Sequence, residues 1–268
     1  MEFRRSWLRS TRWYASAFMW TELMCPCSGN DARIRSALGV EHHDSDVSSR
    51  SDYKATWDKL AANSDDAKIY VAGYSDEAEL DRMGGYTADL LDRFVRIRKS
   101  DVILEIGCGV GRVGKFVARR CQKWIGTDIS GNMLKYARRR LETVPNVQLI
   151  ELGEVGLREI ESSSVDVVYC TVVFMHLFEW DRYRYVLEAF RVLRRGGRCF
   201  FDNVDITSTH GWKVFMDSYA FEPARRPAHL SMVSSGDELL TYARKAGFKD
   251  VRLHRWDDAW VGVTGVRP

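Results

Sequence analysis

Short apolar segments alternate with amphipathic helical segments through residues 99–268, and this alternation constrains the fold more than any other feature of the chain. Strands are expected at 102–106, 124–128, 147–152, 165–170, 198–203, 251–255 and 260–264. Strands that are apolar along their whole length must be covered on both faces, which is typical of parallel sheets. The expected fold class is therefore α/β, with a doubly wound, mostly parallel seven-stranded sheet.

Two details refine this expectation. The last two strands are separated only by Trp256-Asp257-Asp258-Ala259, which is too short for a parallel crossover, so the sheet is expected to end in an antiparallel β-hairpin. The helix expected over 181–194 has an apolar face that should pack on the sheet, made of Tyr183, Val186, Leu187, Phe190 and Leu193.

The first expected strand runs directly into a glycine-rich turn, Gly107-Cys108-Gly109-Val110-Gly111, and a helix follows. A sharp reversal from strand to helix needs backbone angles that residues with a Cβ rarely adopt, and the missing side chains let a ligand lie against the main chain. Unpaired N–H groups at the start of the helix suit an anionic group. The turn therefore indicates a nucleotide-type binding site.

An alternative interpretation of this turn is a dinucleotide site, because Gly109-Val110-Gly111-Arg112-Val113-Gly114 matches the pattern G-x-G-x-x-G. In that pattern the first glycine ends the strand, whereas here Gly107 ends it and Gly109 stands two residues further along. The glycine register and the terminal hairpin count against a NAD-dependent oxidoreductase, which stays open as a second hypothesis.

Four motifs in order resemble those of class I S-adenosylmethionine-dependent methyltransferases, in particular the small-molecule methyltransferase domain family. They are Leu104-Glu105-Ile106-Gly107-Cys108-Gly109-Val110-Gly111, Trp124-Ile125-Gly126-Thr127-Asp128-Ile129-Ser130, Val165-Asp166-Val167-Val168-Tyr169-Cys170 with Phe174-Met175-His176-Leu177, and Leu193-Arg194-Arg195-Gly196-Gly197-Arg198. The resemblance spans about residues 100–265 and implies a Rossmann-like fold, S-adenosylmethionine as cofactor and methyl transfer as the reaction. Arg195 departs from it by replacing the usual proline, and Gly153-Glu154 stands where the family commonly has Gly-Asp.

The resemblance also implies a cofactor site, made of Glu105, Gly107, Gly109, Gly111, Asp128, Ile129, Met133 and Glu154. Asp128 ends the second strand across from the glycine turn and is expected to accept hydrogen bonds from both ribose hydroxyls. Glu105 suits a ligand that carries an ammonium and a sulfonium. Ile129 and Met133 are expected to sandwich the adenine, and Glu154 or a neighbouring backbone N–H to recognise its exocyclic edge. Structural alternatives are an ion pair of Glu105 with Arg112 or Lys115, a helix-capping role for Asp128, and core positions for the apolar residues.

Candidate residues for the acceptor side lie after the fourth and fifth strands. His176 is the candidate general base if the acceptor is a hydroxyl, and its alternative role is to shape the loop. Asp202 ends the fifth strand at the edge where α/β sheets bind ligands, so it is a candidate substrate contact; capping of the following loop is the alternative.

Two insertions are expected to build the acceptor pocket of the methyltransferase domain, which should span 99–268. Residues 51–98 form a helical cap with Trp57, Tyr70 and Tyr74, and about residues 205–234 form a lid insertion with Trp212 and Tyr219. These aromatic residues suit a small, partly aromatic or apolar acceptor. Their alternative role is a satellite core beneath a long connection.

Residues 1–50 show no sustained period and are expected to be a poorly ordered extension. Its first twenty residues carry four arginines and Glu2, which equals the net charge of +3 of the whole chain, so the remaining body is neutral. A neutral body argues against a nucleic-acid partner. So does the segment after the fourth strand, Thr171-Val172-Val173-Phe174, which lacks the Asn-Pro-Pro-Tyr type of signature.

Cysteines and hydropathy bound the remaining function classes. The pair Cys25-Pro26-Cys27 lacks zinc-site spacing, so no metal is expected, and the scattered cysteines favour reduced thiols in the cytoplasm. No window has the roughly 18 uninterrupted apolar residues of an integral membrane segment. We therefore expect a cytoplasmic S-adenosylmethionine-dependent methyltransferase with a small-molecule acceptor, and O-methylation is slightly favoured over N-methylation as the reaction. A protein that binds the cofactor without catalysis is a further alternative.

Overall fold

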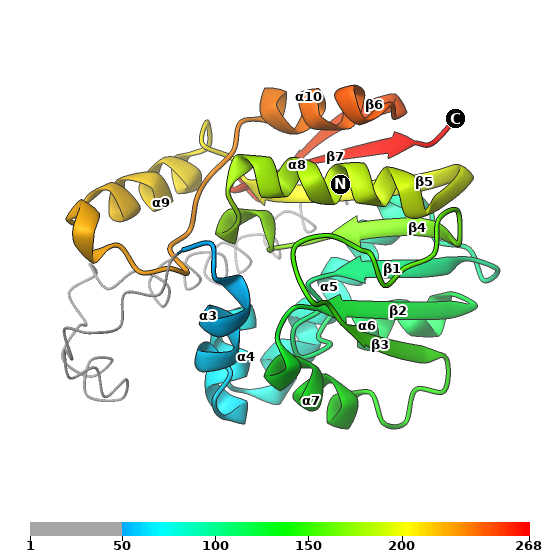
Figure 1. Cartoon of the computed structure of the whole chain (residues 1–268), viewed down its shortest axis with the longest axis horizontal. Coiled ribbons are helices and arrows are strands. Elements are labelled where there is room, and N and C mark those ends of the chain that lie inside the picture. The colour runs from blue at the N-terminus through cyan, green and yellow to red at the C-terminus, as the bar shows by residue number, and fades with distance from the viewer. Residues whose placement is uncertain (1–49) are drawn as a thin grey trace, which may run out of the picture.

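A computed structural model of the protein describes residues 50–268, and a seven-stranded sheet forms the centre of this part (Figure 1). The strand order is β3-β2-β1-β4-β5-β7-β6. The strands are β1 (Val102–Ile106), β2 (Lys123–Asp128), β3 (Val147–Glu151), β4 (Val165–Cys170), β5 (Leu193–Val204), β6 (Lys249–Trp256) and β7 (Trp260–Val266). The expectation of a poorly ordered extension, and the Cys25-Pro26-Cys27 pair, fall outside the described residues.

The register of the sheet confirms the predicted fold class. Strands β3, β2, β1, β4 and β5 run parallel, whereas β7 is antiparallel to both β5 and β6. At the hairpin Trp256 pairs with Trp260, and the residues that turn the chain include Asp257 and Asp258, both with positive φ. Consecutive residues with positive φ give a hairpin the twist that matches its strands.

Helices cover both faces of the sheet and enclose one apolar core on each. Behind it in Figure 1 lie α5 (Glu77–Val95) and α6 (Gly114–Val117), followed by the short helix η2 (Ala118–Arg120). In front lie α8 (Glu179–Val192) and α10 (Gly236–Ala246). Trp124 is buried in the rear core, which also includes residues of α7 (Gly131–Arg140), and Phe201 is buried in the front core.

Two helical segments lie outside this sandwich. The helices α3 (Tyr53–Leu60) and α4 (Ser64–Ala72) begin at side-chain caps, since Asp52 accepts from the Ala55 N–H and Asn63 from the Asp65 and Asp66 N–H groups. The helix α9 (Thr209–Tyr219), followed by η4 (Pro223–Arg225), projects away from the sheet at the left of Figure 1. The domain boundaries at 50 and 98 stay predictions.

The apolar face predicted for α8 is confirmed for Val186, which is buried, and for Tyr183 and Phe190, which pack against the front core, but the centre of the buried face is rotated. The buried side chains of the helix are Arg182, Tyr185, Val186, Ala189 and Val192, whereas Leu187 is 43% exposed and Leu193 already belongs to β5. The buried Arg182 explains the difference. Its guanidinium donates to the Phe174 carbonyl and Ser234 Oγ and pairs with Glu238, so a charged residue occupies the face that sequence patterning assigns to apolar ones.

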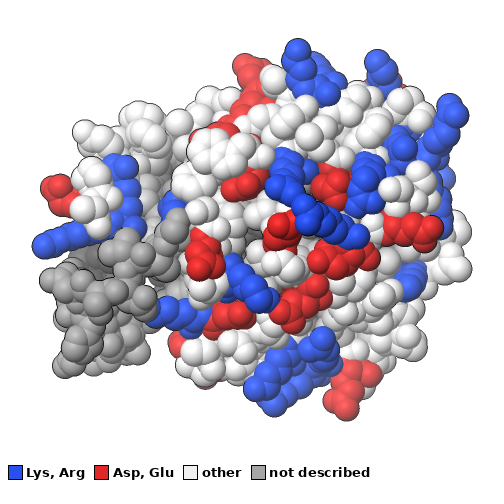
Figure 2. Space-filling model, viewed as in Figure 1, with Lys and Arg blue, Asp and Glu red and all other residues white. Residues whose placement is uncertain are grey.

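Lys and Arg side chains interleave with Asp and Glu over the face seen in Figure 2. Among residues 50–268, none of the helices combines the length and apolar character that a membrane crossing requires. In the same part of the chain, histidines, cysteines and carboxylates do not gather in threes in a way that could hold a metal ion.

Candidate functional site

A cavity of about 90 Å³ lies at the carboxyl ends of β1 and β2, beneath α3 and α4. Its lining brings together most of the predicted cofactor residues, namely Glu105, Gly107, Gly109, Asp128, Ile129 and Met133. The candidate base His176 also lines it, in η3 (Phe174–His176), and so do Trp57 and Tyr70 of the predicted cap. Gly111, Glu154, Asp202, Trp212 and Tyr219 are not part of the lining.

The glycine turn adopts the left-handed backbone that its sequence predicts. Gly107 has a φ of 69° and Gly109 a φ of 52°. A Cβ at Gly109 would lie 2.8 Å from Val71 of α4, so a larger residue cannot keep this packing. Gly111 also has positive φ, but the space beside it is taken by Leu141 and Ala137. Gly111 thus turns the chain without reaching the cavity.

Asp128 is hydrogen bonded to the glycine turn. One carboxylate oxygen accepts from the Gly109 N–H at 2.8 Å, and the other accepts from the Ser130 N–H at 2.9 Å. Burial raises the pKa of Asp128 to about 6, against the opposing effect of these N–H donors. Ser130 Oγ caps α7 by accepting from the Met133 N–H, so the capping role belongs to Ser130 and Asp128 faces the cavity.

Glu105 stands at the end of a buried hydrogen-bond chain. The Trp124 indole N–H donates to the Tyr169 hydroxyl at 3.0 Å, and that hydroxyl donates to Glu105. Burial raises the pKa of Glu105 to about 8, and the Tyr169 hydrogen bond and the charge of Arg112 only partly offset this. The alternative pairing with Lys115 is wrong, because Lys115 pairs with Asp81 at 2.6 Å.

Aromatic side chains of α3 and α4 close the cavity. Tyr53 donates its hydroxyl proton to Asp181 at 2.7 Å and accepts from the Phe178 N–H at 3.1 Å, which ties α3 to the start of α8. Trp57 meets His176 edge-on, with ring centroids 4.9 Å apart. Tyr74 lies away from the lining and packs with Ala72, Leu80 and Val172.

His176 is buried with its Nδ1 3.0 Å from the backbone carbonyl oxygen of His229. Burial lowers the pKa of His176 to about 3, so the ring is neutral near neutral pH. Because a carbonyl oxygen can only accept, Nδ1 carries the proton of the neutral ring and Nε2 keeps the lone pair. His176 can therefore accept a hydrogen bond but is a weak base.

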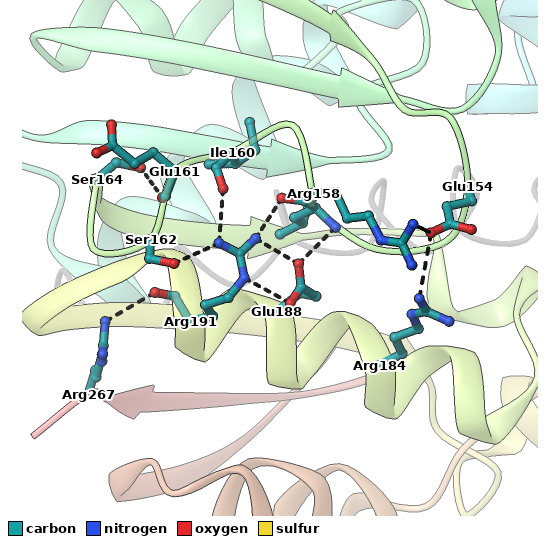
Figure 3. A network of polar contacts seen from close by, with 11 residues as sticks. Glu154, Arg158, Ile160, Glu161, Ser162, Ser164, Arg184, Glu188, Arg191 and Arg267 are labelled. Carbon is teal, nitrogen blue, oxygen red and sulfur yellow. Dashed lines mark hydrogen bonds and ion pairs between the residues drawn. The ribbon is translucent and has the colours of Figure 1, made fainter.

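The structure does not place the Glu154 side chain in the cavity. The side chain is exposed and pairs with Arg158 at 2.6 Å and Arg184 at 3.7 Å, as Figure 3 shows. Strand β3 ends at Glu151, and Glu159 holds the Gly153 N–H at 3.0 Å, which places Glu154 among the arginines rather than in the cavity. Leu152 lines the cavity instead.

The loop that carries Glu154 is fixed to α8 by Arg191. Its guanidinium donates to the Leu157 carbonyl at 2.7 Å and the Ile160 carbonyl at 3.0 Å, and it pairs with Glu188 (Figure 3). This network holds the chain that follows Leu152 against the front of the sheet.

Asp202 does not reach the cavity either. Its carboxylate accepts from the Val172 N–H at 2.8 Å, and burial raises the pKa of Asp202 to about 7. Val172 has a φ of 62°, which is unusual for a β-branched residue, and its side chain lines the cavity. Asp202 thus fixes the loop after β4 and is not placed to contact substrate directly.

The structure does not bring the predicted substrate contacts Trp212 and Tyr219 to the cavity. They are 54% and 65% exposed on α9, where each stacks with Phe215 instead of facing the cavity. The helix begins at the Ser208 cap beyond the end of β5, which directs it outward.

Sequence reasoning missed other residues of the lining, including Tyr53, Arg112, Thr171, Val172, Leu177 and Tyr185. Tyr185 lies on the buried face of α8, and that face was not recognised in the sequence because it also contains a charged residue, Arg182. Arg112 carried a signal in the sequence, as it directly follows the glycine turn.

Comparison with known proteins gives a match of residues 104–201 to a methyltransferase domain family. A probable fatty acid methyltransferase of Pseudomonas putida is 29% identical over 170 residues, 60% of this chain and 41% of that protein. A probable S-adenosylmethionine-dependent methyltransferase of Mycobacterium tuberculosis is 32% identical over 155 residues, 56% of this chain and 50% of that protein. The chain spans less than half the length of the first curated relatives it matches.

Among solved structures, a phosphoethanolamine N-methyltransferase 2 of Haemonchus contortus, in complex with phosphomonomethylethanolamine and S-adenosylhomocysteine, has a TM-score of 0.60. It is 17% identical and the match covers 83% of this chain and 61% of that chain, which establishes the fold alone. The family match contains the glycine turn, Asp128 and His176, and it favours the methyltransferase interpretation over the dinucleotide one. Residues 104–201 thus match a methyltransferase domain, and the chain is similar to probable S-adenosylmethionine-dependent methyltransferases.

Proposed function

We propose that this chain transfers a methyl group from S-adenosylmethionine to a small-molecule acceptor through the cavity beneath α3 and α4. The observation that carries this proposal is the pair of buried carboxylates, Glu105 and Asp128, in that one cavity. Burial removes solvent from the charged forms of both groups, and this raises the pKa of each. A ligand with an ammonium and a sulfonium offsets that cost.

The remaining cofactor contacts follow from the lining. A carboxylate oxygen can accept more than one hydrogen bond, so Asp128 can bind ribose hydroxyls while it still holds Gly109 and Ser130. Ile129 and Met133 enclose the adenine, and Leu152 takes the place predicted for Glu154. The bound cofactor supplies a methyl group on a positively charged sulfur, and the chain contributes position and exclusion of water.

The acceptor side of the cavity favours a small molecule with an apolar or aromatic part. Tyr53, Trp57, Tyr70 and Leu177 enclose it. His176 orients the acceptor because its Nε2 accepts a hydrogen bond from the hydroxyl of the acceptor. Because the pKa of His176 is lowered to about 3, the ring cannot deprotonate an ammonium. A neutral hydroxyl attacks with its own lone pair, and the proton that becomes strongly acidic on the methylated oxygen passes to Nε2. This favours oxygen over nitrogen as the methylated atom.

Calorimetric titration of the full chain tests the cofactor half of the proposal. S-adenosylmethionine and S-adenosylhomocysteine should bind, and NAD should not. Asp128→Ala should weaken binding by roughly 10- to 100-fold, as expected for lost hydrogen bonds to a charged group. Glu154→Ala, an exposed carboxylate outside the cavity, is the control and should leave affinity unchanged. Binding of NAD alone, or full affinity in Asp128→Ala, would contradict the assignment.

Incubation with methyl-labelled cofactor and a pool of small molecules tests the transfer itself. A labelled product identified by mass gives the acceptor and the methylated atom. Tight cofactor binding without any labelled product would instead favour a protein that binds the cofactor and does not catalyse.

A further inference from the structure

A second cavity, of about 350 Å³, shares none of its lining with the first. Its walls come from the end of α5, the segment before β1, β5 and the β6–β7 hairpin. We call it the arginine cleft, because five arginines line it against a single carboxylate, Asp250; they are Arg93, Arg96, Arg98, Arg198 and Arg252. It lies at the amino ends of the parallel strands, opposite the methyltransferase cavity.

Strand register brings two of these arginines to one face of the sheet. Arg198 pairs with Val266 and Arg252 with Thr264, and residues that oppose each other on neighbouring strands project to the same side. Strand β6 contains a bulge between Lys249 and Arg252. Because of it, these two residues are three apart on β6 but pair with Val266 and Thr264, which are two apart on β7. Without the extra residue of the bulge, Arg252 would point to the other face.

The arginine cleft holds one largely buried arginine, Arg198, and four exposed ones with few acidic neighbours. Arg198 pairs with Asp101 at 2.6 Å and donates to the Arg96 carbonyl at 3.1 Å, yet its Nε is buried without a hydrogen-bond partner among the described residues. The other four guanidiniums form no ion pair with a carboxylate of residues 50–268. This contrasts with the interleaved charges of Figure 2.

The floor of the cleft is held in place by aromatic stacking. Phe94 stacks on His254, with ring centroids 4.2 Å apart, and on Phe200 at 5.5 Å. His254 in turn hydrogen bonds to Thr264 Oγ1 at 2.9 Å. Burial and the charge of Arg252 lower the pKa of His254, so the ring is neutral and the positive charge at the site is that of the guanidiniums.

From this placement we infer that the arginine cleft binds a small ligand that carries two or more linked phosphate groups. Guanidiniums present forked donors that match phosphate oxygens and stay charged at every physiological pH. Arg198 and Arg252 stand two strands apart, about 12 Å between their Cα atoms from strand spacing, so their ends converge on a diphosphate more readily than on one phosphate. The arginines surround one bounded cavity rather than forming a track, which disfavours a nucleic-acid strand.

Calorimetric titration of the full chain with inorganic pyrophosphate, at about 150 mM salt so that diffuse attraction is screened, tests this site. We expect saturable binding of one pyrophosphate per chain. The double variant R98Q/R252Q should weaken it by at least about tenfold. The control R138Q/R139Q removes two exposed arginines of α7 outside the cleft and should leave it unchanged. A lower Kd for ADP than for pyrophosphate would support the site and assign a nucleotide as the source of the phosphates.

Three results would overturn the inference: no saturable heat with pyrophosphate, an equal loss in both double variants, or an oligonucleotide whose affinity exceeds that of pyrophosphate and grows with its length. Affinity for S-adenosylhomocysteine should be the same in all three proteins. Failure of the arginine cleft is thereby distinguished from failure of the proposed methyltransferase site.

Discussion

At the scale of single residues, Asp202 links the electrostatics of the core to the shape of the cavity beneath α3 and α4. Its carboxylate accepts a hydrogen bond from the Val172 N–H, and this bond stabilises the left-handed backbone conformation of Val172 in the cavity wall. A residue that sequence position marks as a substrate ligand thus acts on the loop instead. Hydrogen bonds of this kind are invisible in the sequence because they depend on the side-by-side placement of β4 and β5.

The raised pKa of Asp202 predicts a specific pH dependence of stability. Burial lifts it to about 7 in the folded state from an ordinary value of 3.8, so between these two values the folded protein binds more protons than the unfolded chain. Its contribution to stability is therefore largest at low pH and is lost as pH rises toward 7. The neutral Asp202→Asn should raise the Tm at pH 8 more than at pH 5. An equal change at both pH values would contradict the pKa assignment.

Two glycines with positive φ, one in the glycine turn and one in β5, allow a sharper test because their surroundings differ. Gly109 and Gly196 both have positive φ, yet a Cβ would lie 2.8 Å from Val71 at Gly109 and meet nothing within 4 Å at Gly196. Each alanine variant pays the strain of about 1–2 kcal/mol for this backbone conformation. Gly109→Ala should in addition weaken S-adenosylhomocysteine binding by roughly tenfold or more, because the added Cβ forces the turn away from Val71. Titration showing equal affinities for the two variants would remove Gly109 from the site.

At the scale of elements, we expect the cap helices α3 and α4 to move when the proposed cofactor binds. The cavity of about 90 Å³ is smaller than the roughly 300–1,000 Å³ usual for ligand sites. Hydrogen exchange in residues 53–72 should therefore slow when S-adenosylhomocysteine binds, while α10 stays unchanged. Tyr53→Phe removes the hydroxyl that bonds Asp181 and Phe178 and should speed exchange in α3 of the free protein. Identical exchange in α3 with and without ligand would contradict a moving cap.

The face of α8 depends on one buried charge. Arg182 is 1% exposed by side chain and pairs with Glu238 at 2.9 Å. Removal of one partner of a buried pair leaves the other uncompensated, so Arg182→Ala should lower the free energy of unfolding by roughly 3–5 kcal/mol. Arg184 lies on the exposed side of the same helix and pairs with Glu154 at 3.7 Å. Arg184→Ala should lower the free energy of unfolding by less than about 1 kcal/mol. Denaturant titration of both variants compares them directly, and similar losses would contradict the packing described for α8.

These elements show which parts of the molecule the sequence could predict. The glycine turn, Asp128 and the terminal hairpin follow from local rules, because strand ends and turns fix where such residues lie. Glu154 and Trp212 fail for the opposite reason. Their positions depend on loops whose course is decided by partners far along the chain, such as Arg184 for Glu154 and the outward course of α9 for Trp212.

At the scale of the whole molecule, net charge proved a poor guide to local charge. The body of the chain is neutral in sum, which argued against a nucleic-acid partner, yet five arginines from four separate segments meet around one cavity. Composition cannot reveal this, because segments distant in sequence, such as Arg98 and Arg252, become neighbours only through the sheet order.

The order of the sheet also has a consequence for synthesis of the protein on the ribosome. Strand β7 lies between β5 and β6, although it follows both in the chain. Until β7 emerges, β5 presents an unpaired edge and β6 has no neighbour to pair with. A nascent chain must therefore hold most of its fold with an open edge, where chaperones or aggregation compete. The insertion of this one strand gives β5 and β6 their shared neighbour at once.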